Sequence, residues 1–353
     1  MKLWYFPTGG PSAGGASDGS APAGLTIDSL TLHEAEVPRP GRGQVLVRMH
    51  AASLNYRDLM IATGRSARGA LLPDLVPLSD GAGEAVELGP EVTGVAVGDR
   101  VAACFMQTWL GGEISPDDAA SSLGGAIHGV LAEYRLFDQQ GLVKLPEHLS
   151  YEDGATLPCA AVTAWNALFH GPRPLTVGQS VLVLGTGGVS VFALQFARAA
   201  GARVMATSSS DAKLARAKAL GADDGVNYRE HPEWQTVVRD LTGGRGVDHV
   251  VEVGGPGTLP RSIEAARQGG HLHLIGVLSG GGTIDPAPMM RRGVLLRGIY
   301  VGSRQMFEAM NQAIAVHRIA PVIDRVFEFA DAKAAYSHLQ AQTHFGKVVI
   351  RIA

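Results

Sequence analysis

The chain of 353 residues has a net charge of −3, 46% apolar residues and two cysteines. Its length exceeds the size at which a single hydrophobic core stops growing, so we expect two domains. The nearly balanced charge argues against nucleic acid or an acidic membrane surface as a partner. Two cysteines cannot form a disulfide framework, and no apolar run approaches membrane-spanning length. The composition therefore predicts a soluble, cytoplasmic protein.

Residues 1–158 have the pattern of a small β domain. Apolar alternation over Gln44–His50 predicts a half-buried strand, and the glycine-rich turns at 79–84 and 98–101 each lead into another. Short strands at close turn spacing, with little helical pattern, are typical of an antiparallel, barrel-like β domain.

A glycine-rich turn at Gly185–Gly188 is the motif around which the rest of the chain is organised. The four apolar residues before it, Val181–Leu184, predict a strand buried on both faces, and an amphipathic helix follows up to Gly201. Gly185 permits the tight turn, and Gly187 allows a diphosphate to approach the backbone. The free N–H groups at the helix start then face that anion, so the motif predicts a dinucleotide site.

The stretch 159–302 alternates strand-like and helix-like segments. Five strand-like runs are followed by a sixth, Val294–Val301. Six strands with intervening helices predict a complete doubly wound parallel sheet. Residues 303–353 predict two helices and a final strand, Lys347–Ile352, which we expect to return to the first domain. The sequence thus predicts an α/β protein in three segments, with 1–158 and 303–353 forming one domain around the other.

Six short motifs follow one another along nearly the whole chain. They are Asn55–Asp58, Asp80–Glu84, Gly98–Val101, Leu157–Ala164, Gly185–Val189 and Gly346–Val349. In this order, and with a dinucleotide fold inserted in a β domain, they make the chain similar to the medium-chain dehydrogenase/reductase superfamily. The Asn-x-x-Asp form of the first motif resembles the quinone-reductase and zinc-independent alcohol dehydrogenase-like branches. The resemblance implies a Rossmann domain inserted in a GroES-like catalytic domain, and a nicotinamide-dependent oxidoreductase acting on a small molecule.

The zinc-using branch of this superfamily holds its catalytic ion with a Cys, a His and a second Cys. The matching positions here are Asn55, Ser79 and Cys159, so only one ligand type is present. The chain also lacks the four closely spaced cysteines of a structural zinc lobe, and its twelve histidines are scattered rather than paired at ligand spacing. We therefore expect no functional metal ion.

The end of the second strand of the dinucleotide fold predicts NADPH as the cofactor. NAD-preferring folds carry an acidic residue there, where this chain has Ser208 and Ser209. Lys213, one turn into the next helix, is placed to reach a 2′-phosphate, and Tyr228 resembles a tyrosine beside that phosphate in NADPH-dependent quinone reductases. Two alternatives stay open: the serines only cap the helix, or Asp211 reaches the ribose and makes NADH possible.

Further cofactor contacts are implied by the resemblance alone. Thr163 corresponds to a threonine near the nicotinamide ring, with packing inside a helix as the alternative. Lys347 corresponds to a cation against the diphosphate, with a plain strand-start lysine as the alternative. The remaining positions implied to contact the cofactor are Gly185, Thr186, Gly187, Gly188, Val189, Val277, Tyr300 and Val301.

Carbonyl reduction without a metal ion needs hydrogen-bond donors that stabilise charge on the substrate oxygen. Asn55 and Tyr56 are the candidate catalytic donors, with a turn role as the alternative for Asn55. Phe105 and Trp109 are the candidate substrate-binding residues, with core packing as the alternative. Because a conjugated enone or quinone delocalises the developing charge, we expect hydride transfer to an apolar enone, quinone or aldehyde. The alternatives are a zinc-independent alcohol dehydrogenase and a non-catalytic nucleotide-binding redox sensor.

The sixth strand-like run, Val294–Val301, is expected at an edge of the parallel sheet. An exposed edge strand invites pairing with its own copy. We therefore expect a homodimer formed through this strand.

Overall fold

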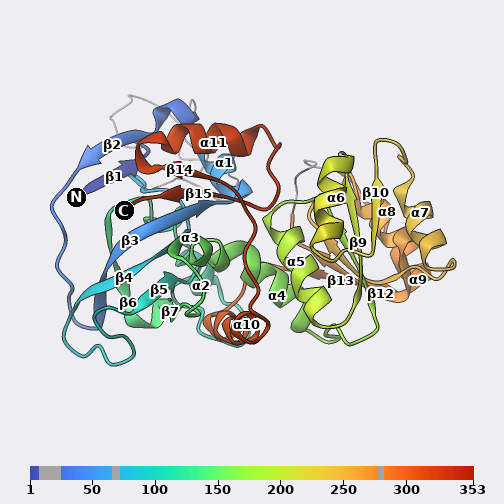
Figure 1. The fold of residues 1–353 in the computed structure, drawn as a ribbon, viewed down its shortest axis with the longest axis horizontal. Helices are drawn as coiled ribbons and strands as arrows, with labels where there is room; N and C mark the ends of the chain where they lie inside the picture. The colour runs from blue at the N-terminus through green and yellow to red at the C-terminus, as the bar shows by residue number, and fades with distance from the viewer. Residues whose placement is uncertain (8–24, 66–71, 277, 279–281) are drawn as a thin grey trace. The chain divides into compact units, whose positions relative to one another are not determined.

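The computed structural model describes residues 1–7, 25–65, 72–276, 278 and 282–353 (Figure 1). The chain divides into two compact units. Unit 1 consists of Met1–Cys159 and Ser303–Ala353, and unit 2 of Ala160–Gly302. Among the described helices, none is both long and apolar enough to cross a membrane.

Unit 1 is built on a seven-stranded sheet in the order β14-β15-β3-β4-β5-β7, with β6 paired to β3. Neighbouring strands run antiparallel except β14 and β15, which are parallel. The strands are β3 (Gln44–Leu54), β4 (Asp80–Leu88), β5 (Arg100–Ala103), β6 (Tyr134–Asp138), β7 (Leu142–Lys144), β14 (Ile323–Glu328) and β15 (Lys347–Arg351), beside a separate pair, β1 (Lys2–Tyr5) and β2 (Thr31–Glu34).

The helices of unit 1 are short apart from one in the C-terminal segment. They are α1 (Tyr56–Ala62), α2 (Pro116–Ala120), α3 (Tyr151–Gly154), α10 (Arg304–His317) and α11 (Ala332–Gln340), with 3₁₀ turns η1 (Ile27–Ser29), η2 (Gln139–Gly141) and η4 (Phe329–Asp331). A π-helical turn, η3 (Leu157–Ala161), spans the boundary of the two units in the sequence.

Strand β3 is longer than its apolar alternation predicts. It continues past His50 to Leu54 because Ala51–Leu54 pair with β15 on one side and Ala51–Ser53 also pair with β4 on the other. Figure 1 shows β15, in red, beside β3, in blue. This pairing brings Lys347, the first residue of β15, to the end of β3, where α1 begins.

Unit 2 is a six-stranded parallel sheet in the order β10-β9-β8-β11-β12-β13. This is the doubly wound order, in which successive strands are added first on one side of β8 and then on the other. The predicted Rossmann-like sheet is therefore confirmed. Its strands are β8 (Ser180–Leu184), β9 (Arg203–Ser208), β10 (Asp224–Asn227), β11 (Val247–Glu252), β12 (Ala266–Leu274) and β13 (Leu295–Gly298). Its helices are α4 (Val162–Phe169), α5 (Gly188–Ala199), α6 (Asp211–Ala219), α7 (Trp234–Leu241), α8 (Leu259–Ala265) and α9 (Ala287–Arg292).

The sixth strand is shorter than the apolar run that predicts it. Only Leu295–Gly298 pairs in the sheet, and Ile299–Val301 leave it, with Val301 in the left-handed region at φ +56°. Strand β13 nevertheless lies at the edge of the sheet. The expected dimer through this strand stays a prediction.

Candidate functional site

The glycine turn of unit 2 has the geometry of an anion site. Gly185 directly follows β8 with φ +71°, a conformation that L side chains rarely adopt, and Gly187 caps α5. A Cβ added at either glycine would meet no heavy atom within 4 Å, so the space in front of the helix start is open. The unpaired N–H groups of a helix start favour an anion. Ser190, at the third position of the motif, donates its hydroxyl to Leu184 O (2.6 Å) and so ties helix to strand.

A cavity of about 350 Å³ lies beside this turn, at the carboxyl ends of the strands of unit 2. In a doubly wound sheet this is the edge at which a dinucleotide binds. Of the predicted cofactor residues, Gly185 and Tyr228 line it. The other lining residues were not predicted as cofactor contacts, because which strand ends, loops and helices meet here depends on strand order; they are Leu184, Thr207, Pro232, Trp234, Val253, Gly254, Thr258, Arg261 and Leu278.

The two residues predicted to flank a 2′-phosphate are joined through the backbone. The Tyr228 amide donates to the carbonyl of Ser208 (3.0 Å), which is buried at the end of β9. The cap of α6 is Ser210, whose hydroxyl accepts from the Lys213 amide, so the helix does not need Ser208 as a cap. Ser209, between the two, is half-buried, as is the Lys213 side chain.

Asp211, the residue that makes NADH possible, has a partner of its own. Its Oδ1 accepts a hydrogen bond from Asn227 Nδ2 (2.9 Å), at the end of the neighbouring strand β10. Asn227 therefore competes with a ribose hydroxyl for this carboxylate oxygen.

Helix α4 and the segment after β13 are linked by one side chain. Asn166, one turn after the buried Thr163, donates Nδ2 to the carbonyl of Val301 (2.7 Å). A β-branched residue in the left-handed region costs on the order of 1–3 kcal/mol and persists where surrounding contacts impose it. The structure thus joins the turn of α4 that follows Thr163 to the backbone of Val301, whereas Val277 lies outside the described residues.

A second group of polar residues lies in unit 1, where β3 ends and α1 begins. Lys347 is only 3% exposed, and its ammonium donates to Leu54 O (2.8 Å) and to Asn55 Oδ1 (2.7 Å). Its Nζ also lies 3.7 Å from Asp80 Oδ2. Asn55 caps α1, and its backbone amide donates to Asp58 Oδ2 (2.7 Å). We call Asn55, Asp58, Asp80 and Lys347 the buried polar centre.

Asp80 connects this centre to the other two positions matched to zinc ligands. Its Oδ1 accepts from the Ser79 hydroxyl (2.6 Å), and its Oδ2 accepts from the Cys159 amide (3.2 Å). Burial raises the pKa of Asp80, while Lys347 and the hydrogen bond from Ser79 act in the opposite direction. Burial and the nearby carboxylates raise the pKa of the Cys159 thiol, so it is protonated at neutral pH.

Comparison with known proteins places this arrangement in a family. Residues 188–316 match the zinc-binding dehydrogenase family model, and residues 41–147 match the alcohol dehydrogenase GroES-like domain. A zinc-type alcohol dehydrogenase-like protein of Schizosaccharomyces pombe is 46% identical over 338 residues, 92% of this chain and 96% of the relative. The chain belongs to the medium-chain dehydrogenase/reductase superfamily. It is therefore an alcohol dehydrogenase-like, NAD(P)-dependent oxidoreductase with a GroES-like domain, as the sequence predicts.

Solved structures of superfamily members agree with this assignment. An NAD-dependent alcohol dehydrogenase is 32% identical over the full length of both chains, with a TM-score of 0.86. A mycobacterial protein solved in complex with NADPH is 27% identical, with a TM-score of 0.76 over 93% of this chain and 97% of its own. The open glycine turn before α5 and the cavity beside it fit a nicotinamide dinucleotide of this superfamily.

The predicted substrate-binding residues of this superfamily member are packed inside unit 1. Phe105 is 2% exposed and lies under the Arg57 guanidinium, 4.7 Å from its Cζ to the ring centroid. Trp109 is 5% exposed and donates its indole N–H to Gly112 O (3.1 Å). Tyr56, the first residue of α1, is half-buried and packs against the apolar core. These contacts support the packing alternative for the aromatic pair, and a substrate role for any of the three stays a prediction.

Proposed function

We propose that this oxidoreductase uses NADPH to reduce an apolar enone, quinone or aldehyde, and that it does so without a catalytic zinc ion. The observation that carries the proposal is the bond between the Lys347 ammonium and Asn55 Oδ1. Catalytic zinc takes about three nitrogen, thiolate or carboxylate ligands. Here the three matched positions offer a carboxamide, a hydroxyl and a thiol, and a buried cation is already bonded to the first. This donor set does not fit zinc.

The chain's own residues then have to bind and orient the reactants. When bound, the cofactor supplies the hydride, and the Gly185 turn holds its diphosphate. Because Lys347 holds Oδ1 of Asn55, the buried Nδ2 is the end of the carboxamide left to donate to a substrate oxygen, in competition with the neighbouring Asp80 carboxylate. Asp80 positions Lys347 through its buried carboxylate. A conjugated carbonyl suits this centre because one neutral donor stabilises charge less than a metal ion does.

A zinc-independent alcohol dehydrogenase is the second candidate. The names of two relatives, a zinc-type alcohol dehydrogenase-like protein and an NAD-dependent alcohol dehydrogenase, favour an alcohol as the substrate, whereas the independence of zinc rests on the donor set described above. The same centre would serve the reverse direction, with Asn55 Nδ2 donating to the reacting oxygen in both.

The proposal is tested by assaying the purified protein with NADPH on enones, quinones and aldehydes, and with NADP⁺ on alcohols, before and after chelation. We expect the highest kcat/KM with a conjugated acceptor, and activity within about twofold after chelation, because no metal ion polarises the substrate. A bound zinc ion that is lost in a Cys159→Ser variant, and whose removal abolishes turnover, contradicts the metal-free mechanism. Faster turnover of alcohols than of every acceptor favours the second candidate.

A Ser208→Asp variant is expected to change cofactor preference from NADPH to NADH. The carboxylate at the end of β9 would accept from the ribose hydroxyls of NADH and repel the 2′-phosphate of NADPH. We expect the ratio of kcat/KM for NADPH to that for NADH to fall by about tenfold or more, which corresponds to ~1.4 kcal/mol. Ser208→Ala is the matched control, because it removes the hydroxyl without adding charge. An unchanged ratio in Ser208→Asp contradicts the assignment of this position to the phosphate.

A further inference from the structure

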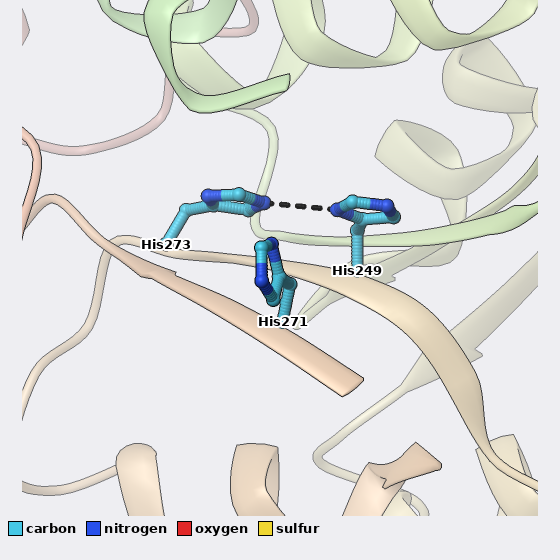
Figure 2. A group of neighbouring side chains, drawn as sticks. All are labelled: His249, His271 and His273. Carbon is cyan, nitrogen blue, oxygen red and sulfur yellow. Dashed lines mark hydrogen bonds between the residues drawn. The ribbon is translucent and has the colours of Figure 1, made fainter. Parts of the chain in front are cut away.

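Three histidines converge on one face of the unit 2 sheet. His249 on β11 is the register partner of His271 on β12, and His273 follows two residues later, on the same face. Although 22 or more residues separate His249 from the other two in the chain, one ring nitrogen from each lies within 4.8 Å of the others. All three are at most 3% exposed. Figure 2 shows the His271 ring pointing toward the gap between the other two rings.

Helix α4 covers this face. Arg297 on β13 is the register partner of His273, and its guanidinium donates to the backbone carbonyls of Asn166 and His170, at the end of α4. The opposite face carries Val250 and Leu272, which belong to the apolar cluster with α7 and α8. The histidines therefore occupy positions that the other face fills with aliphatic side chains.

The hydrogen bonds around His249 fix its tautomer. Gln179 Oε1 accepts from the Thr176 amide (2.9 Å), so this atom is the amide oxygen and not the nitrogen. The same oxygen lies 3.0 Å from His249 Nε2, which must therefore carry a proton. This leaves the lone pair on His249 Nδ1, facing His273 Nε2 at 3.0 Å. A histidine whose second nitrogen donates to a carbonyl oxygen is the usual arrangement of a metal ligand.

His271 and His273 also have nitrogen lone pairs that can bind a metal ion. In the part of the chain that the structure describes, neither nitrogen of His271 has a hydrogen-bond partner, and neither has Nδ1 of His273. The His273 proton can move from Nε2 to Nδ1, which frees Nε2 without any net loss of a proton. Three neutral imidazoles can thus direct three lone pairs to one point. Two unpartnered nitrogens on a fully buried ring are costly, and a metal ion bound to one of them would remove part of that cost.

The charges around the cluster favour neutral imidazoles. Burial lowers the pKa of His249 to about 4 and also lowers the pKa values of His271 and His273. Arg173, Arg267 and Arg297 act in the same direction, and Asp248 opposes them at His249. All three guanidiniums have polar partners: Arg267 pairs with Asp248 (2.6 Å), Arg297 bonds to α4, and Arg173 donates to Gly269 O (2.8 Å). The positive charge of these arginines weakens the binding of any cation. Because the cluster offers imidazole nitrogens, metal ions that prefer imidazole ligands bind best against this charge.

We propose that His249, His271 and His273 form a binding site for a divalent transition-metal ion of the zinc or copper class. Three imidazole nitrogens are ligands that these ions prefer. In a tetrahedral zinc site, two nitrogen ligands lie ~3.3 Å apart. The distance between His249 Nδ1 and His273 Nε2 is 3.0 Å, so it needs to widen only slightly, and the His271 ring has to move closer to both. The ion joins β11 to β12 and stabilises unit 2. It lies on strands of the parallel sheet and takes no part in hydride transfer at the buried polar centre of unit 1.

The test is titration of the chelator-treated, full-length protein with Zn²⁺, Cu²⁺ and Mg²⁺ by calorimetry and by thermal unfolding. We expect one Zn²⁺ or Cu²⁺ per chain, tighter binding of Cu²⁺ than of Zn²⁺, a rise in Tm with both, and no response to Mg²⁺. His271→Phe, which keeps a ring of similar size, and His273→Gln should each weaken Zn²⁺ binding by about tenfold or more, because one of three ligands is lost.

Two controls separate this cluster from other sites. His338→Gln removes a histidine of unit 1 that lies beside Asp324, and Cys159→Ser removes the thiol of unit 1; both should bind Zn²⁺ as the unaltered chain does. Co²⁺ added to the unaltered chain should give the spectrum of a nitrogen-ligated ion, a readout that does not depend on the folding of a variant. A cobalt–thiolate band, no binding by the unaltered chain, or unchanged affinity in both folded cluster variants would overturn the proposal.

Discussion

A Lys347→Met variant is expected to lose both stability and most of its activity. The substitution leaves the fully buried carboxylate of Asp80 without its cation, and breaking a buried pair from one side costs about 3–5 kcal/mol. It also releases Asn55 Oδ1, so the carboxamide is no longer oriented toward a substrate. We expect kcat to fall about a hundredfold, comparable to the loss of one preorganised donor. The measurements are chemical unfolding of the full chain and steady-state kinetics with NADPH.

The double variant Lys347→Met/Asp80→Asn distinguishes charge pairing from catalysis. Removing both charges should recover most of the stability that Lys347→Met loses, while activity stays low because Asn55 remains unsupported. The NADPH dissociation constant separates two roles for the lysine. If Lys347 acts through Asn55, kcat falls and NADPH binding is unchanged. If it contacts the diphosphate, as the superfamily resemblance implies, NADPH binding weakens. A single variant that unfolds and turns over like the unaltered chain would remove Lys347 from the mechanism.

The features that sequence predicts well here are those set by local pattern. The strand before Gly185, the turn and α5 are encoded by consecutive residues, because a buried parallel strand must be apolar and a left-handed turn requires glycine. Six such units in series suffice to predict the doubly wound sheet. Its strand order then places Tyr228 next to Ser208.

The buried polar centre of unit 1 depends on contacts that no local pattern contains. Lys347 meets Asn55 across 292 residues because β15 pairs with β3. From sequence, a lysine at the start of a strand is expected to reach solvent or a ligand, and its near-complete burial follows only from that pairing. Phe105 shows the same limit, since an aromatic residue in a pocket and one in the core have the same local pattern.

Part of the histidine cluster can be recognised in the sequence. The twelve histidines look scattered in the sequence, but His271 and His273 stand two apart in the run that forms β12, which places them on one face. What could not be predicted is the third member, because the register of β11 against β12 decides whether His249 lies beside them.

Asp58 should make the stability of the chain depend on pH near neutrality. Burial raises its pKa from 3.8 to about 7, despite the neighbouring Arg57. Because the folded chain holds this proton more tightly than the unfolded chain, stability falls as pH rises from about 4 to about 7 and then levels off. At 1.36 kcal/mol for each pKa unit, the contribution lost over this range is about 4 kcal/mol. In the described part of the chain, Asp58 Oδ1 has no hydrogen-bond partner, which suits a protonated oxygen.

An Asp58→Asn variant should remove this dependence while keeping the cap of α1, because the carboxamide oxygen can still accept from the Asn55 amide. We expect it to match the unaltered chain near pH 4 and to exceed it in stability at pH 8, measured as the free energy of unfolding in urea. Asp118→Asn is the matched control: Asp118 makes the same capping box with Ser115 at α2, but it is only half-buried, and hydrogen bonds lower its pKa. That control should have a small effect of opposite sign, confined to acidic pH. Parallel pH profiles for the unaltered chain and Asp58→Asn would show that Asp58 is ionised in the folded protein, and that Arg57 and Lys347 compensate fully for its burial.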